Sequence, residues 1–371
     1  MARGRSLSAS IDRISQTALT PHTRFSCDIF CRVVDNYGDI GVCWRLARQL
    51  HHEFSVGVRL IVDDLNSFQK LAPPLNPSLK QQTINSITIV QWSDSGSLTP
   101  ADCVIEAFAC ALPNDYLQKM ATRPPVWLNL EYLSAETWVE EHHQLPSLHP
   151  PLTKHFFFPG FSSKTGGVIR EQDVIPAQLV ERAPHETLKI FVFCYPNAAL
   201  TSLLTAWNAG PHPVWCNLSA GLAEPTTTAR TPRALTLDSQ PFVPQEDFDT
   251  LLRAHHLCFV RGEDSFVRAQ LAGLPFVWHI YPQAEGAHWI KIHAFLDRYC
   301  VGLDRDAAQA LRDMWVAWNA EDTATIGEAW QAFSQLLPTL CKHARQWAET
   351  LTKMPDLATN LVTFYRENAT I

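Results

Sequence analysis

Two aspartates four residues apart, Asp35 and Asp39, come directly after the apolar run Cys27–Val34. The run is typical of a buried strand, and the turn-forming residues after it indicate a tight strand-to-helix junction. A carboxylate at the end of a buried strand is well placed to act as a general base, and a second carboxylate nearby can raise its pKa. The alternative is structural, since Asp39 can also cap the helix and Asp35 can stabilise the turn.

A second polar segment follows another apolar run, Leu257–Val260, and precedes a predicted helix over Phe266–Ala272. The segment reads Arg261-Gly262-Glu263-Asp264-Ser265. Amides at the start of a helix bind diphosphates well, and an arginine beside them adds a positive charge. The glutamate of this segment is suited to accept a hydrogen bond from a sugar or ribose hydroxyl. Capping by Asp264 and Ser265 is again the alternative, but the segment is more polar than a cap requires.

Aromatic residues at the ends of other predicted strands favour a nucleotide site. Phe193 and Tyr195 end the strand that begins at Leu188, and Phe248 lies shortly after Gln245. Aromatic rings at such positions can stack on a base, and the amide of Gln245 can read its edge. Each ring taken singly is more often part of a core.

The apolar runs predict strands that alternate with helices in two series. The predicted strands are Cys27–Val34, Val56–Val62, Ile87–Gln91, Cys103–Ala107, Val126–Leu130, Leu188–Tyr195, Pro213–Cys216, Pro241–Val243, Leu257–Val260 and Pro275–Ile280. A Pro-, Ser- and Gly-rich stretch over 144–187 separates the series, and the pattern is helical from about residue 284. This order predicts two α/β halves with parallel sheets and a ligand cleft beyond the carboxyl ends of the strands.

Composition excludes several classes of protein. The chain has 371 residues, of which 46% are apolar and 18% charged, which is ordinary for a globular protein of about two domains. The net charge of −7, without a run of basic residues, argues against nucleic acid as the main partner. The missing third glycine of a GxGxxG pattern argues against a dinucleotide-dependent oxidoreductase.

The ten cysteines form no CxxC pair and mostly lie in apolar runs, so we expect them to be reduced and buried, with no disulfide and no zinc. No apolar run approaches the ~20 residues of a membrane span. Residues 1–23 lack the apolar centre of a secretory signal and are interpreted as a disordered extension. We therefore expect a cytoplasmic protein with no membrane partner.

Several strings resemble one bacterial family, the EarP protein-arginine rhamnosyltransferases that modify elongation factor P. The strings are Asp35-Asn36-Tyr37-Gly38-Asp39-Ile40-Gly41, Val260-Arg261-Gly262-Glu263-Asp264-Ser265-Phe266-Val267-Arg268-Ala269-Gln270, Trp127-Leu128-Asn129-Leu130-Glu131-Tyr132-Leu133, Phe158-Pro159-Gly160-Phe161 and Trp278-His279-Ile280-Tyr281-Pro282-Gln283. The similarity covers the chain from about residue 24, and its two longest strings are the most specific.

The resemblance implies a GT-B glycosyltransferase, in which two Rossmann-like domains face each other across a cleft. It implies domains over 24–175 and 176–354, with the last helix, about 355–371, crossing back to the first. The implied reaction is inverting, metal-independent transfer of L-rhamnose from dTDP-β-L-rhamnose to an arginine of elongation factor P, without a cofactor. The family's catalytic residues fall on Asp35, Asp39 and Glu263. Its donor-binding residues fall on Phe193, Tyr195, Gln245, Phe248, Arg261, Asp264 and Ser265.

Two other functions stay open on sequence alone. One is a GT-B transferase with a different nucleotide sugar or acceptor, because sugar selectivity depends on single contacts. The other is a non-catalytic module that binds a nucleotide or a protein. The carboxylates in both polar segments argue against the second, since a pure binder needs no base at a strand end.

Overall fold

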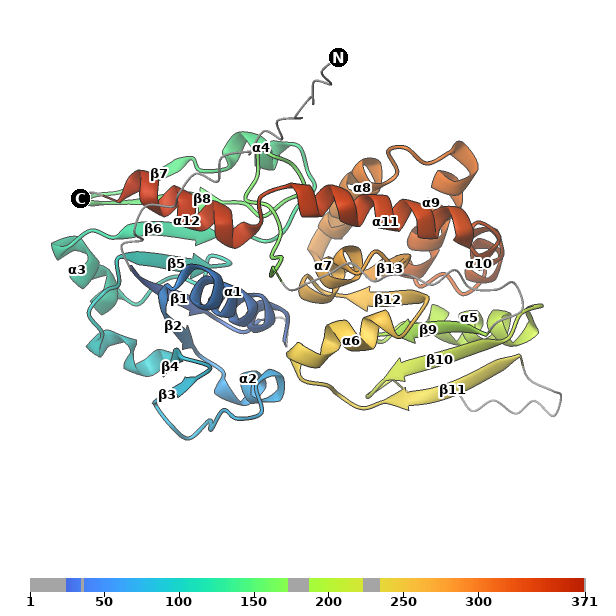
Figure 1. The fold of residues 1–371 in the computed structure, drawn as a ribbon, viewed down its shortest axis with the longest axis horizontal. Coiled ribbons are helices and arrows are strands. Elements are labelled where there is room, and N and C mark those ends of the chain that lie inside the picture. The colour runs from blue at the N-terminus through green and yellow to red at the C-terminus, as the bar shows by residue number, and fades with distance from the viewer. Residues whose placement is uncertain (1–24, 35–36, 173–186, 223–233, 370–371) are drawn as a thin grey trace, which may run out of the picture.

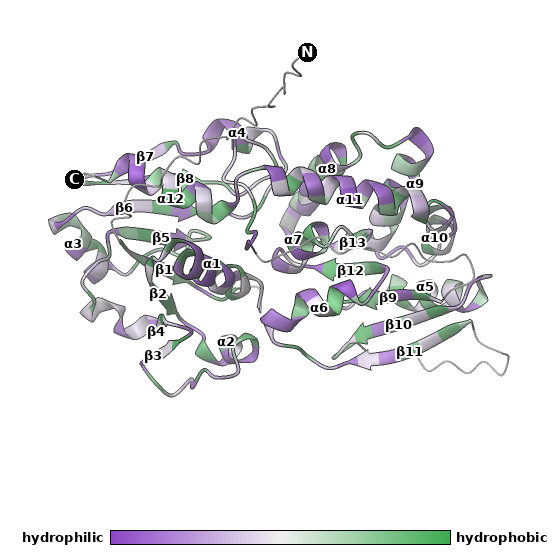
Figure 2. Cartoon of the chain, in the orientation of Figure 1, coloured by the Kyte–Doolittle hydropathy of each residue, from purple (hydrophilic) through white to green (hydrophobic). Residues whose placement is uncertain are grey.

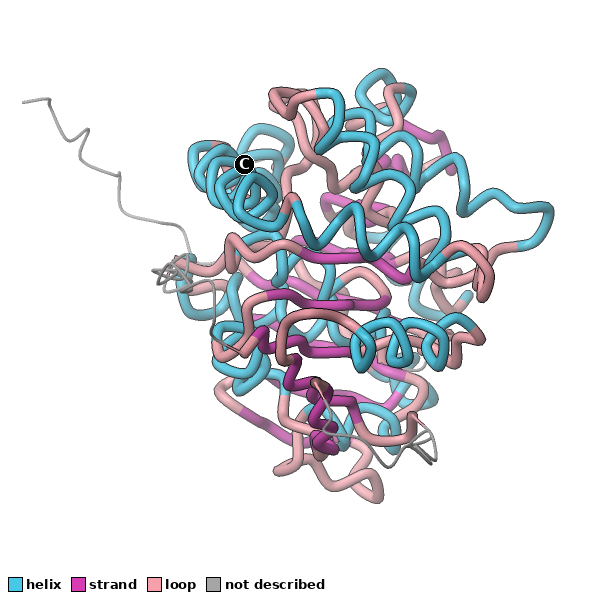
Figure 3. Tube along the Cα trace, turned by 90° about the vertical axis from the view of Figure 1, so that its right-hand side faces the viewer, coloured by secondary structure: helices cyan, strands magenta, loops and turns pink. Residues whose placement is uncertain are grey.

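The computed structural model describes residues 25–34, 37–172, 187–222 and 234–369, which form two α/β units side by side (Figure 1). The predicted extension 1–23, the predicted domain boundary at 175/176 and the aspartate at position 35 lie outside the described residues. Strands run through the middle of the molecule with helices on either side of them (Figure 3). This arrangement confirms the predicted α/β architecture.

The first unit is built on a sheet of order β3-β4-β2-β1-β5-β6-β8-β7, in which β3 and β7 are antiparallel to their neighbours and the other strands are parallel. Its strands are β1 (Ser26–Cys31), β2 (Gly57–Val62), β3 (Gln81–Ile84), β4 (Ile87–Gln91), β5 (Cys103–Ala107), β6 (Val126–Leu130), β7 (Pro146–His149) and β8 (Leu152–Phe157). Its helices are α1 (Gly38–Phe54), α2 (Leu65–Leu71), α3 (Asn114–Thr122) and α4 (Trp138–His142).

The second unit has an all-parallel sheet of order β11-β10-β9-β12-β13. Its strands are β9 (Leu188–Val192), β10 (Val214–Ser219), β11 (Leu235–Gln240), β12 (Leu257–Arg261) and β13 (Phe276–His279). Its helices are α5 (Ala199–Ala209), α6 (Phe248–Arg253), α7 (Asp264–Leu271), α8 (Ala287–Tyr299), α9 (Arg305–Asn319), α10 (Ile326–Gln335) and α11 (Leu337–Lys353). The central strands of both sheets are mainly apolar (Figure 2), as expected of parallel strands that are covered on both faces.

The last helix, α12 (Leu357–Asn368), packs on the first unit although α11 lies on the second (Figure 1). The helical path breaks at Pro355, which cannot continue a helix, and Asp356 then caps α12 by accepting the Thr359 N–H at 3.0 Å. The apolar face of α12, including Leu361 and Phe364, joins the core of the first unit. The chain therefore connects the two units twice, once through residues near 170 and once here.

Most predicted strands are present, and the exceptions have a physical reason. The prediction of a strand over Pro241–Val243 is wrong, because the fifth strand of this sheet is β11, Leu235–Gln240. Strand β11 lies at the edge of the sheet and exposes polar side chains, which interrupt the apolar run that would predict it. Pro241 has no N–H with which to extend the strand. Strands β7 and β8 lie within 144–187, where the sequence predicts no regular element. Nine of the ten cysteines are buried, as predicted, and Cys341 is half-buried.

Candidate active site

A cleft of about 350 Å³ lies where the two units meet, at the carboxyl ends of strands from the second sheet. The first unit contributes residues from the start of α1 and from α2. Parallel strands present their following loops at one edge, so residues that are far apart in sequence converge here. The predicted site residues that line the cleft are Phe193, Tyr195, Gln245, Phe248, Arg261, Glu263, Asp264 and Ser265.

The turn between β12 and α7 sets the polar part of the cleft. Gly262 has a φ of +63°, a conformation that glycine adopts without strain, and its carbonyl accepts the Trp278 Nε1–H at 2.8 Å. Helix α7 then begins at Asp264, where the first-turn amides lack helical partners. The Ser265 hydroxyl donates to the Arg261 carbonyl, which ties the turn to the end of the strand.

Arg261 lies between two aromatic rings. Its guanidinium carbon is 4.5 Å from the ring centroid of Phe193 and 4.7 Å from that of Tyr195. The Phe193 ring also packs edge-on against Phe248, with centroids 5.6 Å apart. Cation–π contacts hold the guanidinium in one place without neutralising it. The arrangement provides a fixed positive charge beside an aromatic wall, which suits a nucleoside diphosphate.

Glu263 is a carboxyl group with an unusual proton affinity. Burial raises its pKa from the ordinary 4.5 to about 7, and the negative charge of Asp39 acts in the same direction. The Leu133 N–H, which donates to Oε2 at 3.0 Å, and the nearby Lys291 act against this shift. Because Leu133 belongs to the first unit, this hydrogen bond also joins the two units next to the cleft.

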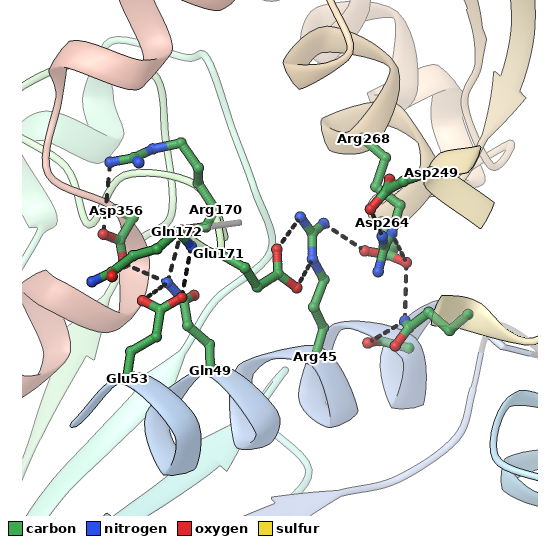
Figure 4. Close-up of polar contacts among 12 residues, drawn as sticks. Arg45, Gln49, Glu53, Arg170, Glu171, Gln172, Asp249, Asp264, Arg268 and Asp356 are labelled. Atoms are coloured by element: carbon green, nitrogen blue, oxygen red, sulfur yellow. Dashed lines mark hydrogen bonds and ion pairs between the residues drawn. The ribbon is translucent and has the colours of Figure 1, made fainter. Parts of the chain in front are cut away.

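Asp264, the next residue, is held by positive charges (Figure 4). Its carboxylate accepts from Arg45 Nη1 at 2.9 Å, from Arg268 Nε at 3.0 Å and from Gln245 Nε2 at 3.0 Å. Burial alone would raise the pKa of Asp264, but the guanidinium groups of Arg268 and Arg45 lower it more, so that it lies below its usual value. With its side chain bonded in this way, Asp264 offers a ligand chiefly its backbone N–H.

Gln245 belongs to a short 3-10 turn, η2 (Gln245–Asp247), and is 5% exposed. Its Nε2 donates both to Asp264 and to the Gly41 carbonyl of α1, at 2.8 Å. Its Oε1 accepts no hydrogen bond from the described residues. Since both partners of the nitrogen are acceptors, the amide orientation is defined, and the oxygen is buried without a donor among the described residues.

On the first unit, Asp39 lies in the first turn of α1 and is 2% exposed. Its Oδ2 accepts the Val34 N–H at 2.9 Å, and the Tyr132 hydroxyl donates to Oδ1 at 3.3 Å. These two neutral donors orient Asp39 beside the cleft, whose lining includes its neighbours Gly38 and Gly41. Its predicted partner at position 35 falls outside the described residues.

Two groups of residues near the site were missed by sequence reasoning. Tyr132 stacks on Phe108, with centroids 4.4 Å apart, and Lys291 Nζ lies 5.7 Å from the centroid of the same tyrosine ring. Tyr132 occurs in one of the quoted family strings, but nothing in its spacing indicates contact with Asp39. No sequence motif marks Arg45, in α1, as a site residue, because its partners Glu171 and Asp264 are distant in sequence and come close to it only in the folded protein.

Neither a metal-binding cluster nor a membrane-spanning helix is found in the described part of the chain. It contains no cluster of three or more His, Cys, Asp or Glu side chains arranged to hold a metal ion. None of its helices combines the length and hydropathy needed to cross a bilayer.

Comparison with known proteins decides the family. Residues 27–366 match the family described as "Elongation-Factor P (EF-P) rhamnosyltransferase EarP". The chain belongs to the EarP family. A protein-arginine rhamnosyltransferase of Pseudomonas putida is 46% identical over 373 residues, covering 92% of this chain and 98% of that protein. The enzyme of the same name from Pseudomonas aeruginosa is 42% identical, covering 92% and 99%. The protein is thus a glycosyltransferase of the protein-arginine rhamnosyltransferase type.

Solved structures agree with this family assignment. A structure described as "Structural basis for EarP-mediated arginine glycosylation of translation elongation factor EF-P" superposes with a TM-score of 0.63 at 33% identity, covering 93% of this chain and all of that one. The spinosyn forosaminyltransferase SpnP and rhamnosyltransferase SpnG give TM-scores of 0.53 and 0.51 at 9% and 12% identity, over 94% and 93% of this chain and 100% of each of theirs. These last two show the fold alone, and they confirm the predicted GT-B architecture of the EarP family member.

Proposed function

We propose that this protein transfers L-rhamnose from dTDP-β-L-rhamnose to an arginine side chain of elongation factor P, with inversion at the anomeric carbon. The observation that carries the proposal is that Glu263 and Arg261 line one cleft between the two units, with Asp39 close enough that its charge raises the pKa of Glu263. The solved EarP structure that superposes on this chain belongs to a protein described as mediating arginine glycosylation of EF-P. Because that acceptor is a translation factor, the reaction would take place in the cytoplasm.

On the donor side, the second unit would bind the nucleotide. The aromatic rings of Phe193, Tyr195 and Phe248 are suited to the base and ribose, and the amide of Gln245 lines the same cleft, where it would read an edge of the base. The diphosphate would contact Arg261 and the first-turn amides of α7, at Asp264 and Ser265. These positive groups would stabilise the leaving dTDP, so we expect transfer to continue when divalent metals are chelated.

On the acceptor side, the chemistry requires a carboxylate. A guanidinium has a pKa above about 12, so it attacks only as it loses a proton. In the proposed step an arginine nitrogen bonds to the anomeric carbon, the bond from that carbon to the diphosphate oxygen breaks, and the oxygen leaves with the electron pair. Asp35 takes the proton, and Asp39 holds the guanidinium by charge-assisted hydrogen bonds.

Glu263 is assigned to the donor sugar. It is next to the proposed diphosphate contact Asp264 and its Oε2 is fixed by the Leu133 N–H. A carboxyl in this place can accept hydrogen bonds from sugar hydroxyls, whereas the proton of the acceptor has to be removed on the opposite face of the sugar.

The intact mass of elongation factor P, after incubation with the protein and dTDP-β-L-rhamnose, tests the proposal. We expect the mass to rise by one deoxyhexose, and not to rise when the acceptor arginine is replaced by lysine. The Asp35→Asn variant should bind the donor and give no transfer. If the donor binds but elongation factor P gains no mass, the acceptor assignment is wrong. If the donor does not bind, the proposed donor is wrong.

A further inference from the structure

Helix α1 carries a polar stripe along one of its faces. The backbone of Gly41 and the side chains of Arg45, Gln49 and Glu53 recur at intervals of four residues, so they lie above one another on the helix. We call these four residues the α1 seam. Apolar residues at other positions of the helix, such as Leu46, pack into the core of the first unit. The seam therefore occupies a face of α1 that the first core does not use.

The N-terminal half of the α1 seam contacts the cleft-lining residues of the second unit. The Gly41 carbonyl accepts from Gln245, and Arg45 donates to Asp264 Oδ1 at 2.9 Å. Gln245 also donates to Asp264 Oδ2. These bonds form a closed circuit that joins α1, η2 and the start of α7. Since α1 carries Asp39 in its first turn, the circuit fixes that carboxylate relative to the turn that follows β12.

The C-terminal half of the α1 seam contacts the two places where the chain crosses between the units (Figure 4). Gln49 Nε2 donates to the Arg170 carbonyl at 2.8 Å and to Asp356 Oδ1 at 3.0 Å. Glu53 Oε1 accepts the Gln172 N–H at 2.7 Å. One helix face thus contacts the cleft at one end and both connections between the units at the other.

Arg45 is the centre of the seam and is 1% exposed. Besides Asp264 it contacts Glu171, through Nε and Nη2 at 2.6 Å each (Figure 4). Burial opposes the charge of Glu171, yet Arg45 lowers the pKa of that carboxyl to about 2, so the pair is ionised. Well-packed apolar residues often replace a buried ion pair without loss of stability. Apolar residues cannot replace the planar guanidinium group of Arg45, which holds the carboxylates of Glu171 and Asp264 at a fixed angle to each other.

We propose that Arg45 is a positioning residue of the transfer reaction: it holds Asp264 against α1 and so sets the distance between Asp39 and the bound nucleotide sugar. The inference rests on the proposed function, because it takes the cleft as the donor site. In this reaction the acceptor group and the donor carbon are held by different units. Misplacement of reacting groups by about 1 Å costs roughly a hundredfold in rate. A buried bridge between the units is a means of preventing such misplacement.

The proposal is tested with Arg45→Met and Arg45→Lys, measuring kcat, KM for elongation factor P and the Kd of dTDP. We expect kcat to fall about a hundredfold in Arg45→Met and about tenfold in Arg45→Lys, which keeps the charge but cannot bridge both carboxylates with a planar fork. The KM for elongation factor P should change less than about threefold, because Arg45 is buried away from an acceptor protein. If Arg45→Met does not fold, Arg45→Lys decides, and wild-type kcat in a folded Arg45→Lys overturns the proposal.

Glu171→Gln is the matched control, since it weakens the other contact of Arg45 and leaves the bond to Asp264 in place. We expect it to lower the unfolding temperature while kcat stays within about threefold of wild type. If Glu171→Gln and Arg45→Lys lose kcat equally, Arg45 acts through general stability and the proposal is wrong. The wild-type reaction separates the two proposals. If elongation factor P gains no mass, the proposed function is wrong. If it gains mass and Arg45→Lys has the wild-type kcat, only the positioning role of Arg45 is wrong.

Discussion

Helices α1 and α7 both begin after a buried parallel strand, and both carry an aspartate in their first turn. Asp39 accepts hydrogen bonds from the Val34 amide and the Tyr132 hydroxyl, both of its own unit. Asp264 accepts from two guanidinium groups and an amide, and one of the guanidinium groups, that of Arg45, comes from the other unit. Two similar strand-to-helix junctions therefore differ: Asp39 has two neutral donors from its own unit, and Asp264 has cationic donors from both units.

This difference separates two uses of a carboxylate. Cations neutralise Asp264, which removes the repulsion that a bare carboxylate would exert on a diphosphate at the same helix start. The Val34 amide and the Tyr132 hydroxyl, both neutral, orient the Asp39 carboxylate, and a carboxylate is what a guanidinium acceptor requires. Glu263 stands next to Asp264 in sequence, yet its pKa is raised to about 7 whereas that of Asp264 is lowered. Position in the fold, rather than residue type, sets the state of each carboxyl.

Among Asp39, Asp264 and Glu263, the largest effect is expected for Asp39→Asn. The asparagine oxygen can still accept the Val34 N–H, but the side chain no longer attracts a guanidinium, so kcat should fall by about a hundredfold or more. The affinity for dTDP-rhamnose should stay within about threefold of wild type. Steady-state kinetics and calorimetric donor binding measure the two quantities. A large loss of donor affinity with a normal kcat at saturation would assign Asp39 to the donor side.

A smaller effect is expected for Asp264→Asn. Hydrogen bonds to charged groups contribute roughly 1.5–3 kcal/mol, so the free energy of unfolding should fall by about 2 kcal/mol in a urea titration. At saturating donor, kcat should fall less than it does in Asp39→Asn. If Asp264→Asn unfolds at the same urea concentration as the wild type, the ion pairs of Asp264 with Arg45 and Arg268 do not stabilise the fold. The proposed difference between the two aspartates would then be wrong.

The smallest effect is expected for the ionisation of Glu263. Its pKa of about 7 means that the carboxyl is mostly protonated near pH 6 and ionises as the pH rises. The ionised form accepts hydrogen bonds from sugar hydroxyls better, so the ratio of the dTDP-rhamnose affinity to the affinity for the terminal methyl ester of dTDP should rise up to about tenfold between about pH 6 and about pH 8.

Dividing by the affinity of this ester removes the repulsion between the diphosphate and the protein, because the ester and the donor carry the same charge throughout this pH range, whereas the terminal phosphate of free dTDP titrates at about pH 6. In Glu263→Gln the ratio should not change with pH. The same rise in the variant would show that another group is responsible. By the same linkage, Glu263 makes the folded protein less stable as the pH rises from about 4.5 to about 7, because the unfolded chain gives up that proton first.

Both strand-to-helix junctions were predictable from sequence, because a buried strand has an apolar run and a turn has its own residue types. The eight predicted site residues of the second unit line one cleft, because the loops that follow parallel strands lie at one edge of the sheet. The edge strand β11 and the hairpin β7–β8 were not predictable, since their exposed faces interrupt the apolar pattern. Whether each site residue has the predicted role stays a prediction.

By itself the sequence determined the α/β series, the two polar segments and the family strings, because these depend on residue types that are adjacent along the chain. Only the tertiary structure decided the electrostatic state of each carboxyl and the place of Arg45. Burial and partner charge are set by residues distant in sequence, as in the contact between Arg45 and Asp264, 219 positions apart. A hydrogen bond of this kind leaves no periodic pattern in the chain, since its two ends meet only after both sheets have formed and packed.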